Sequence, residues 1–101
     1  MTDLWWIQEK AKERFRRKVY NSKRWHDTRH YMLAYSPFCV RCEVDGRLTP
    51  ANEVDHITNL GVIFQQGNGL NDERIYNTDN LQCLCKRCHS KKTNEDKKLD
   101  R

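Results

Sequence analysis

Two Cys-x-x-Cys pairs constrain this chain more than any other feature of its sequence. The first pair is Cys39 and Cys42, and the second is Cys85 and Cys88. A two-residue spacer lets both thiolates reach one ion at about 2.3 Å, so two such pairs predict a tetrahedral zinc site with four cysteine ligands. The interval between the pairs, residues 43–84, is longer than in simple zinc ribbons. Further structure is therefore inserted between the two halves of the site.

The size and composition of the chain suggest that its fold needs the extra stability of such a metal site. Its 101 residues form one small domain, and only 37% of them are apolar while 33% are charged. A core this thin is near the lower limit for a domain that folds unaided. The opening "MTDLWWIQEK" has no apolar signal region, and no apolar run of membrane length follows. We therefore expect a cytoplasmic protein without membrane contact, in a reducing compartment where paired cysteines favour zinc over disulfides.

The remaining cysteine and two of the histidines have simpler interpretations. Cys83 stands two residues before Cys85, and the four-thiolate set is complete without it, so we predict that it packs in the core. His26 and His30 have the i, i+4 spacing of metal ligands on a helix, but no third ligand is evident in the sequence. We predict that both lie on the surface.

Charge is distributed in three blocks along the chain. Residues 1–42 carry ten Lys and Arg against four Asp and Glu, a balance of +6, and residues 80–101 carry seven against three, a balance of +4. Residues 43–79 carry two against seven, a balance of −5. Basic flanks suit a polyanion, and an acidic middle suits a divalent cation.

Hydrophobic periodicity predicts helices at both ends of the chain. Apolar residues recur at three- and four-residue steps over 4–20, with Thr2 or Asp3 placed to cap, and a second helix is expected over 23–35. Good helix formers predict a polar helix from about 86 to 97. Between them, "RLTPANEVDHI" is predicted to form two short strands joined by "PAN". Residues 58–78 show little periodicity and are predicted to form a long surface loop.

Four polar residues are interleaved with the cysteine pairs. Asp55 and His56 follow a strand-like stretch, Asn80 lies in "TDNLQ", and His89 follows nine residues later. Neutral imidazole is the usual general base near pH 7, and successive strand residues face opposite ways. Asp55 can therefore bind a metal while His56 meets a water molecule. Either Asn80 holds the His56 ring or it adds a metal ligand.

The order of these residues resembles that of HNH endonucleases. Their ββα-metal (His-Me finger) motif places a His at a strand end, an Asn in a turn and a His on the following helix, and "VDHI…DNLQCLCKRCHSKKT" is similar to the zinc-knuckle form found in small phage and prophage enzymes. The resemblance covers residues 38–93 tightly. "YNSKRWHDTRHYMLAYSPFC" resembles the helical lead-in of those proteins, with Trp25 and Arg29 in register. Thr93 stands where colicin-type nucleases have a further histidine, so Asp55 would have to supply a ligand.

The resemblance implies an α+β fold with a ββα-metal core stapled by the zinc site and preceded by helices. It divides the chain into a basic helical lead-in, residues 1–37, and a nuclease core, residues 38–101, within one compact unit. The implied activity is metal-dependent hydrolysis of DNA with low sequence specificity. His56 and Asn80 would be catalytic, and Asp55 and His89 would hold Mg²⁺, Mn²⁺, Ni²⁺ or Zn²⁺.

The partners expected on these grounds are DNA and, by analogy with phage enzymes encoded near packaging genes, a phage terminase. We expect a monomer that contacts phosphates through Arg29, Lys86, Arg87, Lys91 and Lys92. A different class of function is a zinc-knuckle module that binds nucleic acid or a partner without catalysis. The combination of Asp55, His56, Asn80 and His89 favours the enzyme.

Overall fold

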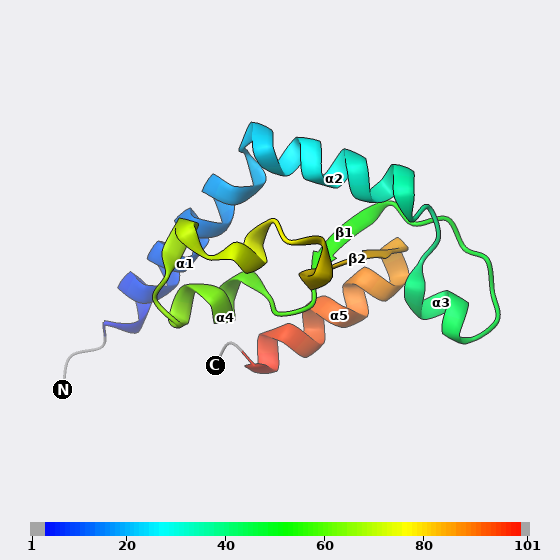
Figure 1. Cartoon of the computed structure of the whole chain (residues 1–101). Coiled ribbons are helices and arrows are strands. Elements are labelled where there is room, and N and C mark those ends of the chain that lie inside the picture. The colour runs from blue at the N-terminus through cyan, green and yellow to red at the C-terminus, as the bar shows by residue number, and fades with distance from the viewer. Residues whose placement is uncertain (1–3, 100–101) are drawn as a thin grey trace.

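A small two-stranded sheet lies at the centre of the computed structural model, which describes residues 4–99. Strand β1 (Glu53–His56) pairs antiparallel with β2 (Leu81–Leu84), so that Asp55 is opposite Gln82 and His56 is opposite Leu81. Helix α2 (Lys23–Tyr35) covers one face of this sheet, and helix α5 (Lys86–Leu99) covers the other (Figure 1). Successive residues of β1 therefore face different helices.

The predicted helices are confirmed to within one or two residues at most ends. Helix α1 (Trp5–Tyr20) buries Phe15 and Val19, and α2 is capped by Ser22, whose hydroxyl oxygen accepts a hydrogen bond from the Trp25 amide at 3.1 Å. The predicted caps of α1, Thr2 and Asp3, lie outside the described residues. Among residues 4–99, none of the helices is both long and apolar enough to cross a bilayer.

The N-terminal helices share a hydrophobic core with the two strands and with the segment that joins them. Side chains from α1 and α2 pack with side chains from β1, β2 and the segment that joins the two strands. The buried members are Phe15, Val19, Trp25, Met32, Val54, Leu60, Ile63, Ile75, Leu81 and Cys83. The lead-in helices thus form part of the structure that supports the sheet.

The predicted surface loop over 58–78 is wrong. This segment contains helix α4 (Leu60–Gln65) and three short 3₁₀ helices, η1 (Gly69–Asn71), η2 (Glu73–Ile75) and η3 (Thr78–Asn80). Each piece is too short to show a helical period, and side chains at Asn59, Asp72 and Asn77 cap α4, η2 and η3. Leu60, Ile63 and Ile75 anchor the segment in the core, each at most 2% exposed.

The predicted pair of strands around "PAN" is also wrong. Only Glu53–His56 forms a strand there, and its partner is β2, far along the chain. Pro50 takes part in an isolated bridge with Phe38 rather than a ladder. Proline lacks the N–H that a regular strand donates, which explains why no strand precedes it.

Candidate metal centre and catalytic pocket

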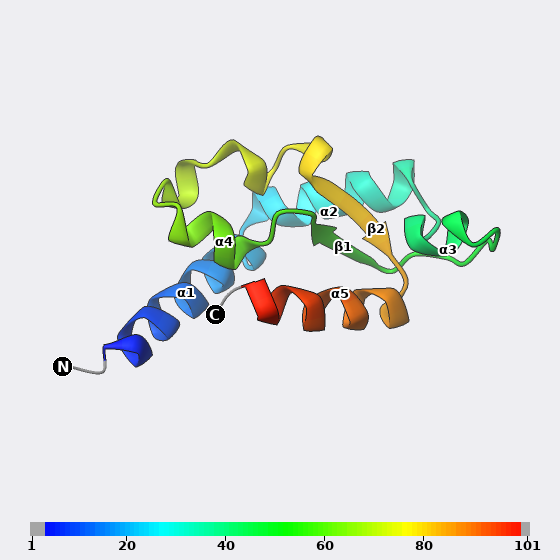
Figure 2. The ribbon, with the colours of Figure 1, turned by 90° about the horizontal axis from the view of Figure 1, so that it is seen from below.

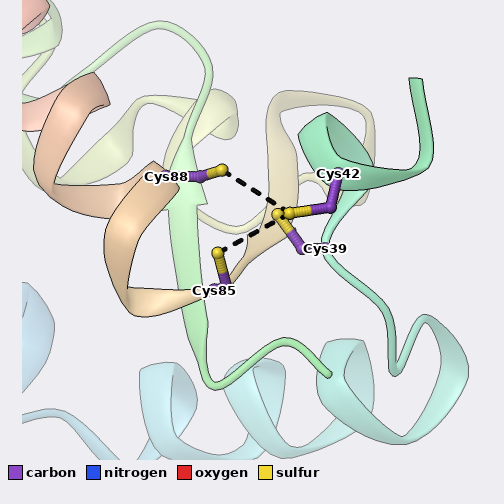
Figure 3. A group of neighbouring side chains, drawn as sticks. All are labelled: Cys39, Cys42, Cys85 and Cys88. Atoms are coloured by element: carbon purple, nitrogen blue, oxygen red, sulfur yellow. Dashed lines mark hydrogen bonds between the residues drawn. The ribbon is translucent and has the colours of Figure 1, made fainter. Parts of the chain in front are cut away.

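The four paired cysteines meet at one end of the molecule. Cys39 and Cys42 lie at the start of the short helix α3 (Val40–Val44), Cys85 follows β2, and Cys88 lies in the first turn of α5. The Cys42 sulfur is 3.9 Å from that of Cys85 and 3.9 Å from that of Cys88, and the four sulfurs lie within 4.8 Å of one another (Figure 3). A tetrahedron with arms of about 2.3 Å has edges of about 3.8 Å. These residues fit a zinc ion.

Cys83 lies apart from this cluster, as predicted. It is 1% exposed and belongs to the hydrophobic core, and its thiol donates to the Met32 carbonyl at 3.4 Å. Cys83 and Leu84 are successive strand residues, so their side chains point to opposite faces of the sheet, and that of Cys83 faces α2.

His56 stands at the end of β1 with one ring nitrogen fixed. Its Nε2 is 2.8 Å from the Ile75 carbonyl oxygen, which can only accept, so Nε2 carries the proton and Nδ1 holds a lone pair. The Trp25 ring stacks on the imidazole, with centroids 4.8 Å apart and planes 20° apart. Burial lowers the pKa of His56, which keeps the ring neutral near pH 7.

The other ring nitrogen of His56 has no protein partner. Among the described residues, Nδ1 is the one buried side-chain nitrogen or oxygen without a hydrogen bond. A buried polar atom left unpaired costs roughly 1–3 kcal/mol, so it is expected to take a water molecule or a ligand. An accepting nitrogen at this place is the arrangement that a general base requires.

Asp55 and His89 meet on the α5 side of β1. Asp55 Oδ1 is 3.8 Å from His89 Nε2, and two atoms at that separation can both reach one ion at about 2.1 Å. The second carboxylate oxygen, Oδ2, accepts from Gln82 Nε2 at 3.2 Å and lies 3.2 Å from Lys92 Nζ. These contacts orient the carboxylate with Oδ1 toward the imidazole. The pair fits a divalent cation.

Asn80 makes hydrogen bonds to the backbone around the two strand ends. Its Oδ1 accepts from the Thr58 amide at 2.8 Å, and its Nδ2 donates to the Arg74 carbonyl at 2.9 Å and to that of Thr58 at 3.2 Å. The side chain thus ties the exit of β1 to η2, whose Ile75 carbonyl holds the His56 ring. This contact with His56 is indirect.

The prediction that Lys92 contacts DNA phosphates is wrong. Its side chain is 8% exposed, and its Nζ lies 2.7 Å from both carboxylate oxygens of Asp96, 3.2 Å from Asp55 and 3.0 Å from the His56 carbonyl oxygen. Lys92 lies one helical turn after Cys88, on the inward face of α5. In this position the Lys92 ammonium group holds the carboxylates of Asp55 and Asp96 in place and does not face a ligand.

The other predicted phosphate contacts divide into two groups. Lys86, Arg87 and Lys91 are exposed on α5 and line a depression beside the cysteine cluster. Arg29 instead donates from Nη2 to the Asn52 carbonyl at 2.8 Å, which ties α2 to the segment before β1. His26 and His30 are exposed, as predicted.

A pocket of about 570 Å³ brings Asp55, His56 and His89 together, whereas Asn80 is not among the residues that line it. Its walls come from β1, α4, α5 and, unexpectedly, from α1. The lining residues are Glu9, Lys12, Arg16, Tyr20, Asp55, His56, Asn59, Leu60, His89, Thr93, Asp96 and Lys97. The α1 side chains could not be predicted to lie here, because the packing of α1 against α4 depends on tertiary structure.

Comparisons with known proteins identify the family of this chain. The family model described as "HNH endonuclease" matches residues 39–95. A "Probable HNH endonuclease" of Lactococcus phage SK1 is 43% identical over 81 residues, which cover 78% of this chain and 79% of that protein. The crystal structure of the HNH endonuclease of deep-sea thermophilic bacteriophage GVE2 with manganese ion is 34% identical, with a TM-score of 0.73 over 97% of this chain and 98% of that one. This chain therefore belongs to the HNH endonuclease family.

Proposed function

We propose that the pocket hydrolyses DNA phosphodiester bonds with His56 as the general base and with Asp55 and His89 as ligands of a divalent ion. One observation carries this assignment: His56, whose Nδ1 has no hydrogen-bond partner, lines the same pocket as Asp55 and His89. A base and a metal-binding pair in one pocket are the two components that phosphodiester hydrolysis by water needs.

The roles follow from the contacts of each side chain. His56 takes a proton from the attacking water at Nδ1, while the Ile75 carbonyl and the Trp25 ring hold the imidazole in place. Asp55 and His89 would hold the ion, and when bound it would stabilise negative charge on the scissile phosphate. Asn80 is a positioning residue, since it fixes the backbone that anchors His56.

The ligand types define the class of metal at each site. One carboxylate and one imidazole leave most coordination positions to water and phosphate, which suits Mg²⁺, Mn²⁺, Ni²⁺ or catalytic Zn²⁺. The manganese ion of the GVE2 enzyme supports a place for Mn²⁺ in that set. The four thiolates suit a structural zinc ion, because a closed set of four leaves no open position for a substrate.

The cleavage assay uses supercoiled plasmid with Mg²⁺, Mn²⁺, Ni²⁺ or Zn²⁺ added in turn to protein that retains its structural zinc. Nicked or linear DNA should form with at least one of these ions and should not form in EDTA. The Asp55→Asn variant should need a higher ion concentration, because an amide is a weaker ligand than a carboxylate. Intact plasmid under every condition would favour the zinc-knuckle module without catalysis.

DNA contact is proposed to involve mainly phosphates, through the exposed α5 residues Lys86, Arg87 and Lys91. Lys91 and Lys92 form a matched pair of neighbours, of which one is exposed and the other buried. Lys91→Ala should weaken binding to unrelated duplexes about equally and should reduce the slope of log K against log salt by about 1. Fluorescence anisotropy at several salt concentrations measures both effects.

Lys92→Ala should instead act on the folded state. Removing one partner from a buried ionic cluster destabilises a protein by on the order of 3–5 kcal/mol, and here it leaves Asp55 and Asp96 without their lysine partner. Denaturant unfolding should separate the two variants. A loss of affinity for one duplex alone in Lys91→Ala would place that lysine at base edges rather than phosphates.

We also propose that the enzyme acts beside a phage terminase, which rests on the phage origin of both relatives. The plasmid assay repeated with the terminase encoded in the same genome tests this. An unchanged cleavage rate and pattern, with no co-purification, would count against the partnership.

A further inference from the structure

Gln82 contacts the metal-binding carboxylate from the neighbouring strand. It lies directly opposite Asp55 in the β1–β2 pair, and its Nε2 donates a hydrogen bond to Asp55 Oδ2 at 3.2 Å. Figure 2 shows the two strands side by side, with α5 running along them. Opposite residues of paired strands point to the same face of a sheet, so Gln82 and Asp55 both point toward α5, the helix that carries His89.

The two oxygens of the Asp55 carboxylate have different partners. Oδ1 lies 3.8 Å from His89 Nε2, whereas Oδ2 accepts from Gln82 and lies 3.2 Å from Lys92 Nζ. Asp55 and His89 line the catalytic pocket, but Gln82 and Lys92 are not among its lining residues. The carboxylate therefore presents Oδ1 to His89, while groups outside the pocket lining hold its other oxygen.

Lys92 and Gln82 hold this second oxygen in different ways. The hydrogen bonds of the Lys92 ammonium group go to the His56 carbonyl at 3.0 Å and to both oxygens of Asp96 at 2.7 Å, so its contact with Asp55 is mainly one of charge. The amide N–H of Gln82 instead makes a directional bond to Oδ2. Gln82 is also neutral, so its replacement removes this bond without changing the net charge of the site.

We propose that Gln82 determines which metal ions the site prefers, by holding Asp55 Oδ2 so that the carboxylate binds an ion through Oδ1 alone. This inference rests on the proposed function of the pocket. Mg²⁺ and Mn²⁺ favour octahedral coordination, whereas Ca²⁺ takes about six to eight oxygen ligands at longer distances and accepts a carboxylate through both oxygens. A carboxylate restricted to one oxygen therefore favours the smaller ions over Ca²⁺.

Gln82→Met tests this role, because methionine has nearly the volume of glutamine but has no N–H group to donate. Removing a residue that orients a metal ligand typically weakens metal binding by about tenfold to a hundredfold. Lys92 still contacts Oδ2 in this variant, so the Kd for Mn²⁺ should rise by about tenfold, at the lower end of that range. The Kd for Ca²⁺ should rise less, because a freed Oδ2 can join Oδ1 on the larger ion.

Calorimetric titration of Mn²⁺ and of Ca²⁺ into protein that retains its structural zinc measures both constants. The control is Gln66→Met, which also removes a glutamine hydrogen bond. Gln66 accepts from Arg74 Nη2 at 2.6 Å, and it is not among the residues that line the catalytic pocket. Both constants should match those of the wild type in this control. Gln82→Asn, whose amide stands on a shorter side chain and falls short of Oδ2, should behave like Gln82→Met and supplies a second variant.

The ratio of the two constants separates this role from a structural one. A disturbed strand would weaken both ions by the same factor, whereas loss of the Gln82 bond should reduce the preference for Mn²⁺ over Ca²⁺. The inference is overturned, and the proposed function stands, if the Gln82 variants bind Mn²⁺ as tightly as wild type, if they lose both ions by the same factor, or if both variants unfold. Mn²⁺ affinity that is unchanged in His89→Ala overturns both. A wild type that binds Mn²⁺ through His89 and cleaves no DNA overturns the proposed function alone.

Discussion

Replacing His56 with alanine should slow DNA cleavage at least about a hundredfold, the usual scale for losing a general base. Asp55 and His89 remain in that variant, so calorimetry should still show binding of the catalytic ion, and anisotropy should still show binding of DNA. The substitution also removes the partner of the Ile75 carbonyl and the ring stacked on Trp25. Unfolding should therefore be measured beside activity, with His56→Gln as a variant that retains more of the side-chain volume.

The matching variant is His89→Ala, which should weaken binding of the metal itself. Raising the ion concentration should restore part of its activity, because Asp55 still offers one ligand. The same treatment should restore nothing to His56→Ala. If calorimetry shows that His56→Ala loses the ion while His89→Ala retains it, the two histidines have been assigned the wrong way round.

A Cys39→Ser change should remove the structural zinc and most of the folded protein with it. Three thiolates leave one position of the tetrahedral site unfilled and should bind zinc more weakly than four. In small domains with a structural zinc site, the free energy of zinc binding contributes directly to the free energy of folding. Zinc content by elemental analysis should fall below one ion per chain, and circular dichroism should show lost helix. Activity should disappear too, since Cys88 and His89 are neighbours at the start of α5.

Cys83→Ser is the control for this experiment. That thiol lies in the hydrophobic core and contacts the Met32 carbonyl, so the serine should cost some stability while zinc stays at one ion per chain. Zinc lost from the Cys83 variant and kept in the Cys39 variant would show that the ligand set is wrong.

The features that were predicted correctly from the sequence are marked either by the spacing of particular residues or by the period of the apolar residues. The Cys-x-x-Cys pairs gave the cluster because a two-residue spacer has few ways to bring two thiolates to one point. The helices over 4–20 and 23–35 were visible because apolar residues repeat over several turns. Asp55 and His56 were separable because adjacent strand residues face opposite sides, and β1 indeed presents them to different helices.

The missed features depend on partners distant in sequence. The Ile75 carbonyl that holds His56 is a backbone group, and every residue has one, so no side chain marks it. Lys92 resembled Lys91 in sequence, and only the direction of α5 against the sheet makes one buried and the other exposed. Likewise, side chains of α1 line the pocket because α1 packs against α4. Helix α4 has only six residues, too few to show a helical period in the sequence.

The cysteine cluster also has a consequence for how this chain reaches its fold. Cys42 and Cys85 are 43 positions apart, and the loop they close contains both strands together with Asp55, His56 and Asn80. Closing a loop of that length in an unfolded chain removes conformational entropy worth about 4 kcal/mol by the relation used for disulfides. If zinc binds to the unfolded chain, this loop-closure entropy is lost before the two strands pair. The strands would then pair within the loop that the zinc site has closed, so their contact would be nearly local in effective chain separation.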